Sequence, residues 1–113
     1  MSYDKIVFYK SVSGKEIIVN QIEKLGTQDQ VKVRNGLKLL NIYELQLLQT
    51  KWVKKIYANP AIYELRIVGK FNFRLFFSII KSRYLITNVF VKKSQKTPRS
   101  ELDLAIKRTK EFT

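Results

Sequence analysis

Four cations near the end of the chain form the part of the sequence best suited to hold an anion. Lys92, Lys93, Lys96 and Arg99 fall within eight residues, and no acidic residue lies among them. The cluster follows an apolar run and leads into a helical pattern. Positive side chains should therefore meet the amides of a helix N-terminus there, which favours a phosphate group.

The residue types that are missing restrict the chemistry. The chain has no cysteine and no histidine, so it lacks thiolates, the commonest metal ligand and the usual general base at neutral pH. We expect neither a metal nor an organic cofactor. Any catalysis must use Lys, Arg, Tyr, Glu or Asp.

The overall charge points to a polyanionic partner. The chain of 113 residues carries a formal net charge of +13, with a pI near 10.1. Such a surface suits nucleic acid, the ribosome, an acidic membrane or an acidic protein, although lysine also serves solubility alone. We expect a single domain over residues 1–113. No signal-peptide core and no membrane-length apolar run occur, so the expected location is cytoplasmic, without a membrane partner.

The first half of the sequence predicts a strand followed by two helices. The strand covers 5–10, and a capping-box spacing from Ser13 to Glu16 precedes a helix that stops near Gly26. Thr27 is the expected cap of the second helix, with Asp29 in its first turn. The apolar positions fall on one face of each helix, and two helices so closely linked should form an antiparallel hairpin: Ile17, Ile18, Ile22, Leu25, Val33, Leu37 and Leu40.

The segment 41–60 has no clear period. We expect a loop or short helix that carries Lys51, Lys54 and Lys55, is anchored to the core by Trp52 and ends at the Asn59-Pro60 break.

The second half predicts an antiparallel meander and a final helix. Apolar alternation indicates strands over 61–68, 71–80 and 84–92, with a tight turn at Gly69-Lys70 and another at 81–83. Thr97 should cap the last helix, with Pro98 in its first turn, Glu101 close by and an apolar inner face. The order β-α-α-β-β-β-α predicts an α+β fold with helices on a mostly antiparallel sheet.

Strand alternation places Arg66 and Arg74 together on an open sheet face, opposite the core row. Only one of Lys92 and Lys93 can join them if the strand stays regular. Two planar guanidiniums suit phosphate oxygens. Alternatively, Arg66 pairs with Glu64 or Glu44, and Arg74 pairs with Asp103.

Three pieces in order, YELRI, FRLFF and FVKKSQKTP followed by ELDLAIKR and a closing EF, resemble a known family. They look like the HigB-type, phage-related branch of the RelE/ParE toxin superfamily. The resemblance covers the whole chain and is strongest over 63–112. It implies a compact toxin fold with a small curved sheet and an antitoxin encoded alongside, expected to be a helix-turn-helix protein. Many such toxins are mRNA interferases, which cut mRNA, often on the ribosome.

Carried over by position, the resemblance implies an active cleft with Arg66, Arg74 and the cluster Lys92, Lys93 and Lys96. RNA supplies its own 2′-hydroxyl nucleophile, so the two arginines can stabilise charge on the phosphate. Lys93 or Lys96 is the expected acid or base, and Tyr84 or Tyr63 is an alternative or a stacking platform. The expected RNA-binding residues are Lys92, Arg99, Tyr84, Lys54 and Lys55. The alternative functions are a ParE-like toxin that inhibits gyrase and a non-catalytic RNA-binding module.

Overall fold

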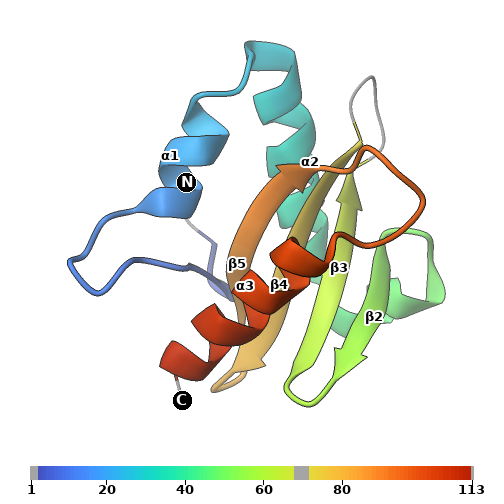
Figure 1. Ribbon diagram of the computed structural model, residues 1–113. Coiled ribbons are helices and arrows are strands. Elements are labelled where there is room, and N and C mark those ends of the chain that lie inside the picture. Colours follow the sequence, from blue (N-terminus) through green and yellow to red (C-terminus); the bar gives the residue numbers. More distant parts are fainter. Residues whose placement is uncertain (1–2, 68–71, 113) are drawn as a thin grey trace.

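The sheet is the central element of the computed structural model, which describes residues 3–67 and 72–112 (Figure 1). Its strands run in the order β1-β5-β4-β3-β2. β1 pairs with β5 in parallel, and the other neighbours are antiparallel. The strands are β1 (Ile6–Phe8), β2 (Val53–Ala58), β3 (Ala61–Ile67), β4 (Phe73–Ile80) and β5 (Arg83–Val91).

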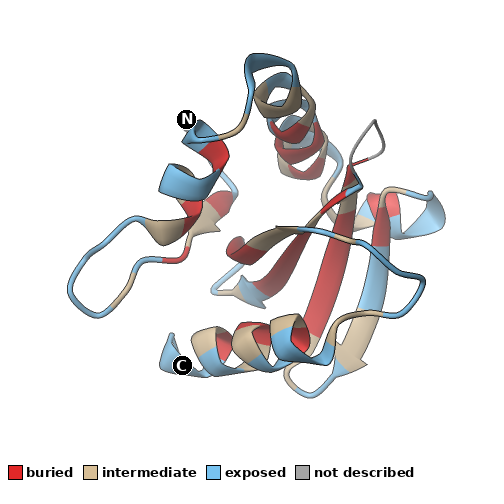
Figure 2. Ribbon diagram, turned by 45° about the horizontal axis from the view of Figure 1, so that its top comes forward, coloured by how far each residue is buried: buried red, intermediate tan, exposed pale blue. Residues whose placement is uncertain are grey.

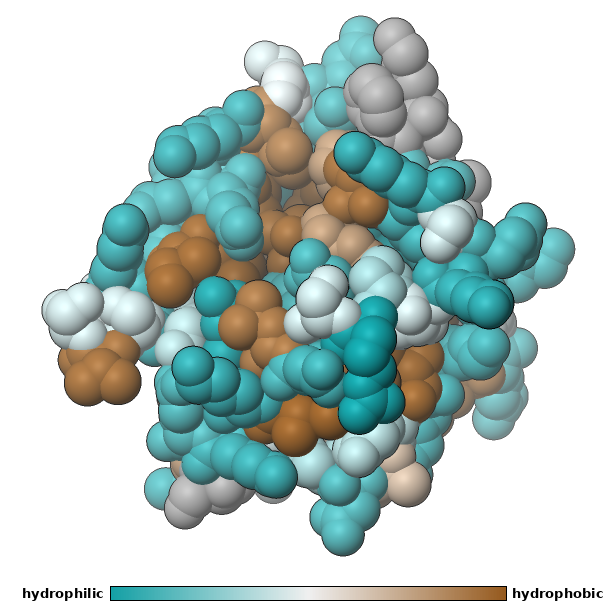
Figure 3. Space-filling view, in the orientation of Figure 1, coloured by the Kyte–Doolittle hydropathy of each residue, from teal (hydrophilic) through white to brown (hydrophobic). Residues whose placement is uncertain are grey.

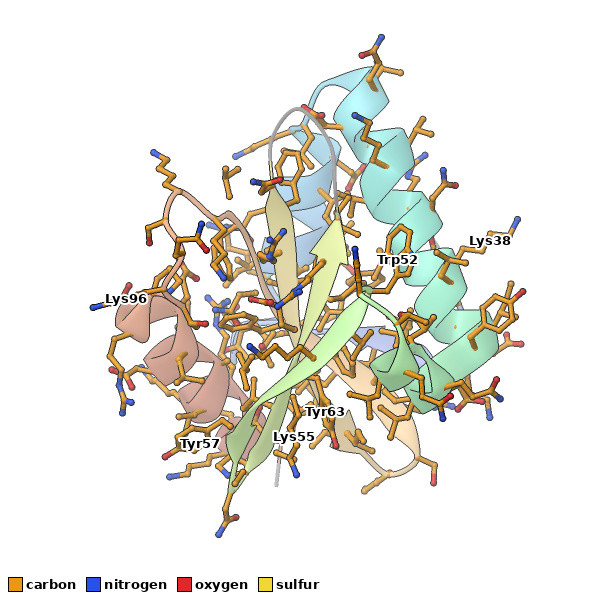
Figure 4. All side chains as sticks on the ribbon, turned by 90° about the vertical axis from the view of Figure 1, so that its right-hand side faces the viewer. Lys38, Trp52, Lys55, Tyr57, Tyr63 and Lys96 are labelled. Carbon is orange, nitrogen blue, oxygen red and sulfur yellow. The ribbon has the colours of Figure 1, made fainter. Side chains whose placement is uncertain are left out.

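Helices cover both faces of this sheet. They are α1 (Ile17–Glu23), α2 (Thr27–Tyr43) and α3 (Arg99–Glu111), with a 3-10 helix, η1 (Glu44–Gln49), after α2. Figure 4, which looks at the β2 edge, shows α2 on one side of the strands and α3 on the other. The expected α+β class, with a mostly antiparallel sheet, is confirmed.

The amphipathic pattern of the first two helices is confirmed, but the predicted caps are wrong. Ile18 and Ile22 of α1 are buried, as are Val33, Leu37 and Leu40 of α2. α1 begins at Ile17, with Glu16 as its N-cap and no side-chain capping bond. The Ser13 hydroxyl bonds that of Ser11 at 3.0 Å instead, and Ser11 accepts a hydrogen bond from the Lys15 amide at 3.0 Å. Gly26, in an extended conformation, is the N-cap of α2, and Thr27 is already helical.

The segment 41–60 holds a strand that the sequence did not predict. After η1 the chain enters β2, which pairs with β3 through the Asn59-Pro60 turn, where the peptide bond is cis. The observed order is therefore β-α-α-β-β-β-β-α. β2 lies at the sheet edge and has a bulge between Lys55 and Tyr57, so its side chains do not alternate cleanly between apolar and polar. The predicted Gly69-Lys70 turn lies outside the described residues.

Two hydrophobic clusters lie on opposite faces of the sheet (Figure 2). The larger one joins α1 and α2 to the sheet, and Trp52 packs against it as predicted. The smaller one contains Ile62, Phe76, Leu102 and Ala105 and joins α3 to the other face. This second cluster corrects the expectation that the face carrying the arginines is open, because α3 covers part of it.

α3 is held on that face by polar contacts as well as apolar ones. The Asn88 amide donates to the Glu101 carbonyl at 2.8 Å, Arg108 donates to the Thr87 carbonyl at 2.7 Å, and the Thr109 hydroxyl bonds Ser78 at 3.0 Å. The helix begins at Arg99 with Pro98 as its N-cap, so Thr97 is not the cap. The predicted inner face is confirmed: Leu102, Ala105 and Thr109 are buried, and Ile106 packs against their cluster.

Candidate functional site

Arg66 and Arg74 lie opposite each other on β3 and β4, which confirms the predicted arrangement. Their Cα atoms are register partners, so both side chains project to the α3 side of the sheet. Arg66 is about one-third exposed, and the Arg74 side chain is only 13% exposed. Two like charges in this position repel unless a third group intervenes.

Glu64 supplies that group. Its side chain is 2% exposed, and its Oε1 accepts a hydrogen bond from Arg66 Nε at 2.9 Å and lies 3.8 Å from Arg74 Nε. The alternative pairing of Arg66 with Glu64 is therefore observed. The predicted pairing of Arg74 with Asp103 is wrong, because Asp103 pairs with Arg99 instead.

The two guanidiniums have different environments. Burial lowers the pKa of Arg74; the charge of Glu64 opposes this shift, and that of Arg66 adds to it. Arg74 also donates from an Nη atom to the Phe73 carbonyl at 3.1 Å. Arg74 is therefore a fixed, partly dehydrated cation, a state in which its attraction for an anion is strengthened.

A bulge in β5 decides which side chains join the arginines. Phe76 pairs with Asn88 and Phe77 with Ile86, so Thr87 is the extra residue and the alternation shifts by one position. Phe90 therefore lies opposite Arg74. Its ring meets Phe76 edge to face at 4.9 Å, so Phe90 is a partly buried apolar surface beside Arg74. Alternation alone left open whether Phe90 or Val89 shares this face.

A polar pocket of about 380 Å³ lies beside Arg74, where β5 ends. The Lys92 amide donates to the Asn72 carbonyl at 2.8 Å and so holds the pocket's two sides together. Its lining residues are Asn72, Arg74, Lys92, Lys93, Ser94 and Gln95. Both lysines line it, contrary to the expectation that only one faces the site, because the strand ends at Val91 and regular alternation stops there.

The other predicted cations lie farther out. Lys96 does not line the pocket, and Figure 4 shows it beside the start of α3, away from β2 and β3. Arg99 is exposed and pairs with Asp103 at 3.0 Å on α3. Lys54 lies opposite Glu64 and shares the face of the arginines, whereas Lys55 lies opposite Tyr63 and faces the other way.

The two tyrosines do not fit the role expected of them. Tyr84 and Tyr63 are buried on the α1 and α2 side of the sheet. Tyr63 stacks on Phe77 at 5.2 Å, and the Tyr84 hydroxyl donates to Glu44 at 3.1 Å. Burial, reinforced by this hydrogen bond, raises the pKa of Tyr84 to about 12. Neither ring is placed to stack on a base or transfer a proton at the pocket.

Hydrophilic side chains surround this face of the molecule. Figure 3, in the orientation of Figure 1, shows hydrophilic side chains over much of this face, with several hydrophobic areas between them. The arrangement combines a buried carboxylate with two aligned guanidiniums, two flexible ammonium groups and one aromatic ring. Such a set can hold a phosphate group and stabilise added negative charge on it.

The family of the chain follows from its match to a family model. The model of the phage-derived protein Gp49-like family (DUF891) matches residues 20–110. The chain belongs to the Gp49-like family. This is a family of RelE/HigB-like toxins, so the resemblance seen in the sequence is confirmed at family level. Comparison with curated proteins found no match.

The Gp49-like match includes every candidate site residue. It runs from within α1 almost to the end of α3 and leaves out β1. Arg66, Arg74, Glu64 and the pocket residues 92–95 therefore lie within the part of the chain that the family model matches. Within the described residues, no helix has the length and apolar character needed to cross a membrane.

Proposed function

We propose that this Gp49-like protein is the toxin of a type II toxin-antitoxin system and acts as an mRNA interferase. The observation that carries the proposal is a polar pocket lined by Arg74, Lys92 and Lys93, with Arg66 directly across the strand pair from Arg74, in a member of a toxin family. The reaction is cleavage of single-stranded RNA. The proposed fold type within the superfamily is RelE-like.

The proposed reaction uses the substrate's own nucleophile. The 2′-hydroxyl of one nucleotide gives its proton to a solvent water and its oxygen attacks the adjacent phosphorus. The bond from phosphorus to the 5′-oxygen breaks, and the 5′-oxygen takes a proton from a lysine ammonium, which solvent then reprotonates. The products are a 2′,3′-cyclic phosphate and a free 5′-hydroxyl. Arg74 and Arg66 stabilise the charge that builds on the non-bridging oxygens.

The lysines take the remaining roles. A lysine ammonium can donate a proton to the departing 5′-oxygen, and Lys93, which lines the pocket, is assigned this role. Lys92 holds the phosphate. Lys96, Arg99 and Lys54 lie outside the pocket and, in this proposal, contact the RNA backbone on either side of the scissile phosphate. Phe90 offers its ring to a base next to the scissile bond.

The proposed partners are an antitoxin and translated mRNA. A cationic pocket at the surface can be blocked by an acidic segment of an antitoxin, which we expect to be encoded beside this gene as a helix-turn-helix protein. The acid-base groups are modest, so alignment of the substrate on the ribosome is expected to contribute.

The test is cleavage of a defined mRNA by purified protein, with and without translating ribosomes, followed by mapping of the ends. The expected result is cuts that leave a cyclic phosphate, together with arrest of growth on induced expression. Intact mRNA with stalled supercoiling would favour the gyrase alternative. Tight RNA binding without cleavage would favour a binding module.

A further inference from the structure

The cationic site contains a buried acid that phosphate binding alone does not require. Glu64 is 1% exposed, and the charged groups near it are cations: Arg66 on the same strand, Arg74 diagonally across the β3–β4 pair and Lys54 directly opposite on β2. Its direct partner on β4 is the apolar Phe76. A carboxylate here competes with any phosphate that enters. Its burial is costly unless its charge is compensated.

The geometry of Glu64 explains how two guanidiniums remain side by side. Its Oε1 lies 2.9 Å from Arg66 Nε and 3.8 Å from Arg74 Nε. The hydrogen bond to Glu64 uses the Nε donor, one of the five N–H donors of Arg66, so the donors on its Nη atoms remain available to a phosphate. Within the described part of the chain, Arg74 Nε and Glu64 Oε2 are buried without a hydrogen-bond partner.

The charge of Glu64 has a second consequence. Arg66 and Arg74 alone would present a net charge of two to a phosphate, whereas the same two arginines together with Glu64 present a net charge of one. The attraction for a phosphate in the ground state is therefore weaker than the arginines alone would give. Catalysis gains from interactions that strengthen in the transition state, and uniformly tight binding of the substrate adds nothing to the chemical step.

We propose that Glu64 is a positioning residue that aligns Arg66 and Arg74 and keeps their hold on the ground-state phosphate weak. The proposal has two halves. The alignment half says that Glu64 holds the two arginines in position for cleavage, and it rests on the proposed RNA cleavage. The charge half says that the Glu64 charge weakens phosphate binding by the folded protein, and it can be measured without RNA. Glu64 does not touch substrate in this scheme and acts through the two arginines.

The decisive variant is Glu64→Gln, which keeps the side-chain shape and the oxygen that accepts from Arg66 Nε but removes the charge. Inorganic phosphate should bind this variant about threefold more tightly or better, because the site gains one positive charge. Single-turnover cleavage of mRNA on ribosomes should slow by about tenfold or more. Glu23→Gln is the matched control: it makes the same change in net charge at an exposed position on α1, and neither quantity should change.

A purely structural role would weaken both binding and cleavage, so unchanged or weaker phosphate binding by Glu64→Gln overturns the charge half. If this variant unfolds, phosphate should restore its melting transition, and failure to do so also overturns that half.

Glu64→Asp keeps the charge but shortens the side chain. It should bind phosphate within about twofold of the wild type and cleave more slowly; wild-type cleavage by this variant overturns the alignment half. If the wild type itself cleaves no RNA, the proposed function and the alignment half both fail, and the phosphate measurements still decide the charge half.

Discussion

Among single residues, Arg74 is the one on which the proposed reaction depends most. It is the more buried of the two arginines, lines the pocket and lies opposite Phe90. We predict that Arg74→Ala lowers the single-turnover rate of RNA cleavage by about 100-fold or more, the effect of losing a donor aimed at developing charge. Arg74→Lys should retain only a small part of the wild-type cleavage rate, because lysine lacks the planar guanidinium group.

The control for Arg74 is Arg34→Ala, at an exposed position on α2 remote from the site, where the side chain donates a hydrogen bond to Gln30 at 3.3 Å. Cleavage and RNA affinity should both be unchanged in this control. In Arg74→Ala the RNA dissociation constant should rise far less than the rate falls. Equal losses in affinity and rate would contradict a catalytic role and support a protein that only binds RNA.

Tyr84 provides a prediction about stability at high pH. Its pKa is raised from 10.0 to about 12 in the folded chain, so above pH 10 the unfolded chain loses this proton first. The stabilisation is complete below pH 10 and is lost as pH rises toward 12. We predict that the stability difference between wild type and Tyr84→Phe shrinks by up to about 2 kcal/mol between pH 9 and 12. Urea unfolding at several pH values measures it, and a constant difference would contradict it.

The sequence predicts some residue positions and not others, for a physical reason. Arg66 and Arg74 were placed together correctly because β3 and β4 pair without a bulge. The positions of Lys92 and Lys93 were not predictable, because the sequence does not reveal the β5 bulge or show that the strand ends at Val91, where regular alternation stops. Glu64 was recognised as a partner of Arg66. Its approach to Arg74 depends on a side-chain conformation that alternation does not specify.

At the scale of elements, Gly36 controls how closely α2 approaches β3. A Cβ atom on Gly36 would overlap Cδ1 of Ile67, which is buried in the core. Alanine in a helix interior otherwise gains about 1 kcal/mol over glycine. We predict that Gly36→Ala has little or no stabilising effect alone but stabilises an Ile67→Val background by about 0.5–1 kcal/mol, because valine lacks the overlapping methyl group. Chemical unfolding of the four variants in this double-mutant cycle measures the coupling, and additive effects would contradict the close approach.

The elements differ in how far the sequence reveals them. The sequence predicts β3 and β4 closely where the structure describes them, and it predicts the inner face of α3, because each of these elements buries a regular apolar face. The predicted ends at residues 68 and 71 lie outside the described residues, and the predicted cap of α3 was wrong. β2 was missed, because an edge strand with a bulge and the exposed lysines Lys54 and Lys55 carries no clear alternation. The missing strand matters for the site, because it brings Lys54 opposite Glu64.

At the scale of the whole molecule, the fold places helices on both faces and leaves the cationic pocket beside α3. The sequence predicted one α+β domain but not that α3 shares a face with the arginines. Both faces of the sheet carry apolar side chains, and which face a helix covers depends on the long-range pairing of Leu102 and Ala105 with Phe76. With α3 over part of this face, the cations that stay accessible on it lie on the edge strand and beside the helix: Lys54, Arg66 and the lysines that follow β5.

The charge of the whole molecule can be separated from the charge of the pocket by salt. A net charge of +13 attracts RNA generally, but a contact to a phosphate releases a counterion and gives a slope of about −0.7 in log affinity against log salt for single strands. For a single-stranded RNA too short to reach Lys54, Lys96 and Arg99, the contacts come from Arg66, Arg74, Lys92 and Lys93, and we predict a slope between about −2 and −3. Lys92→Gln should reduce its magnitude by about 0.7, and Arg34→Gln, the same loss of charge on α2, should leave it unchanged. If both variants reduce the slope equally, the binding reflects net charge spread over the surface, and the pocket is not where the phosphates bind.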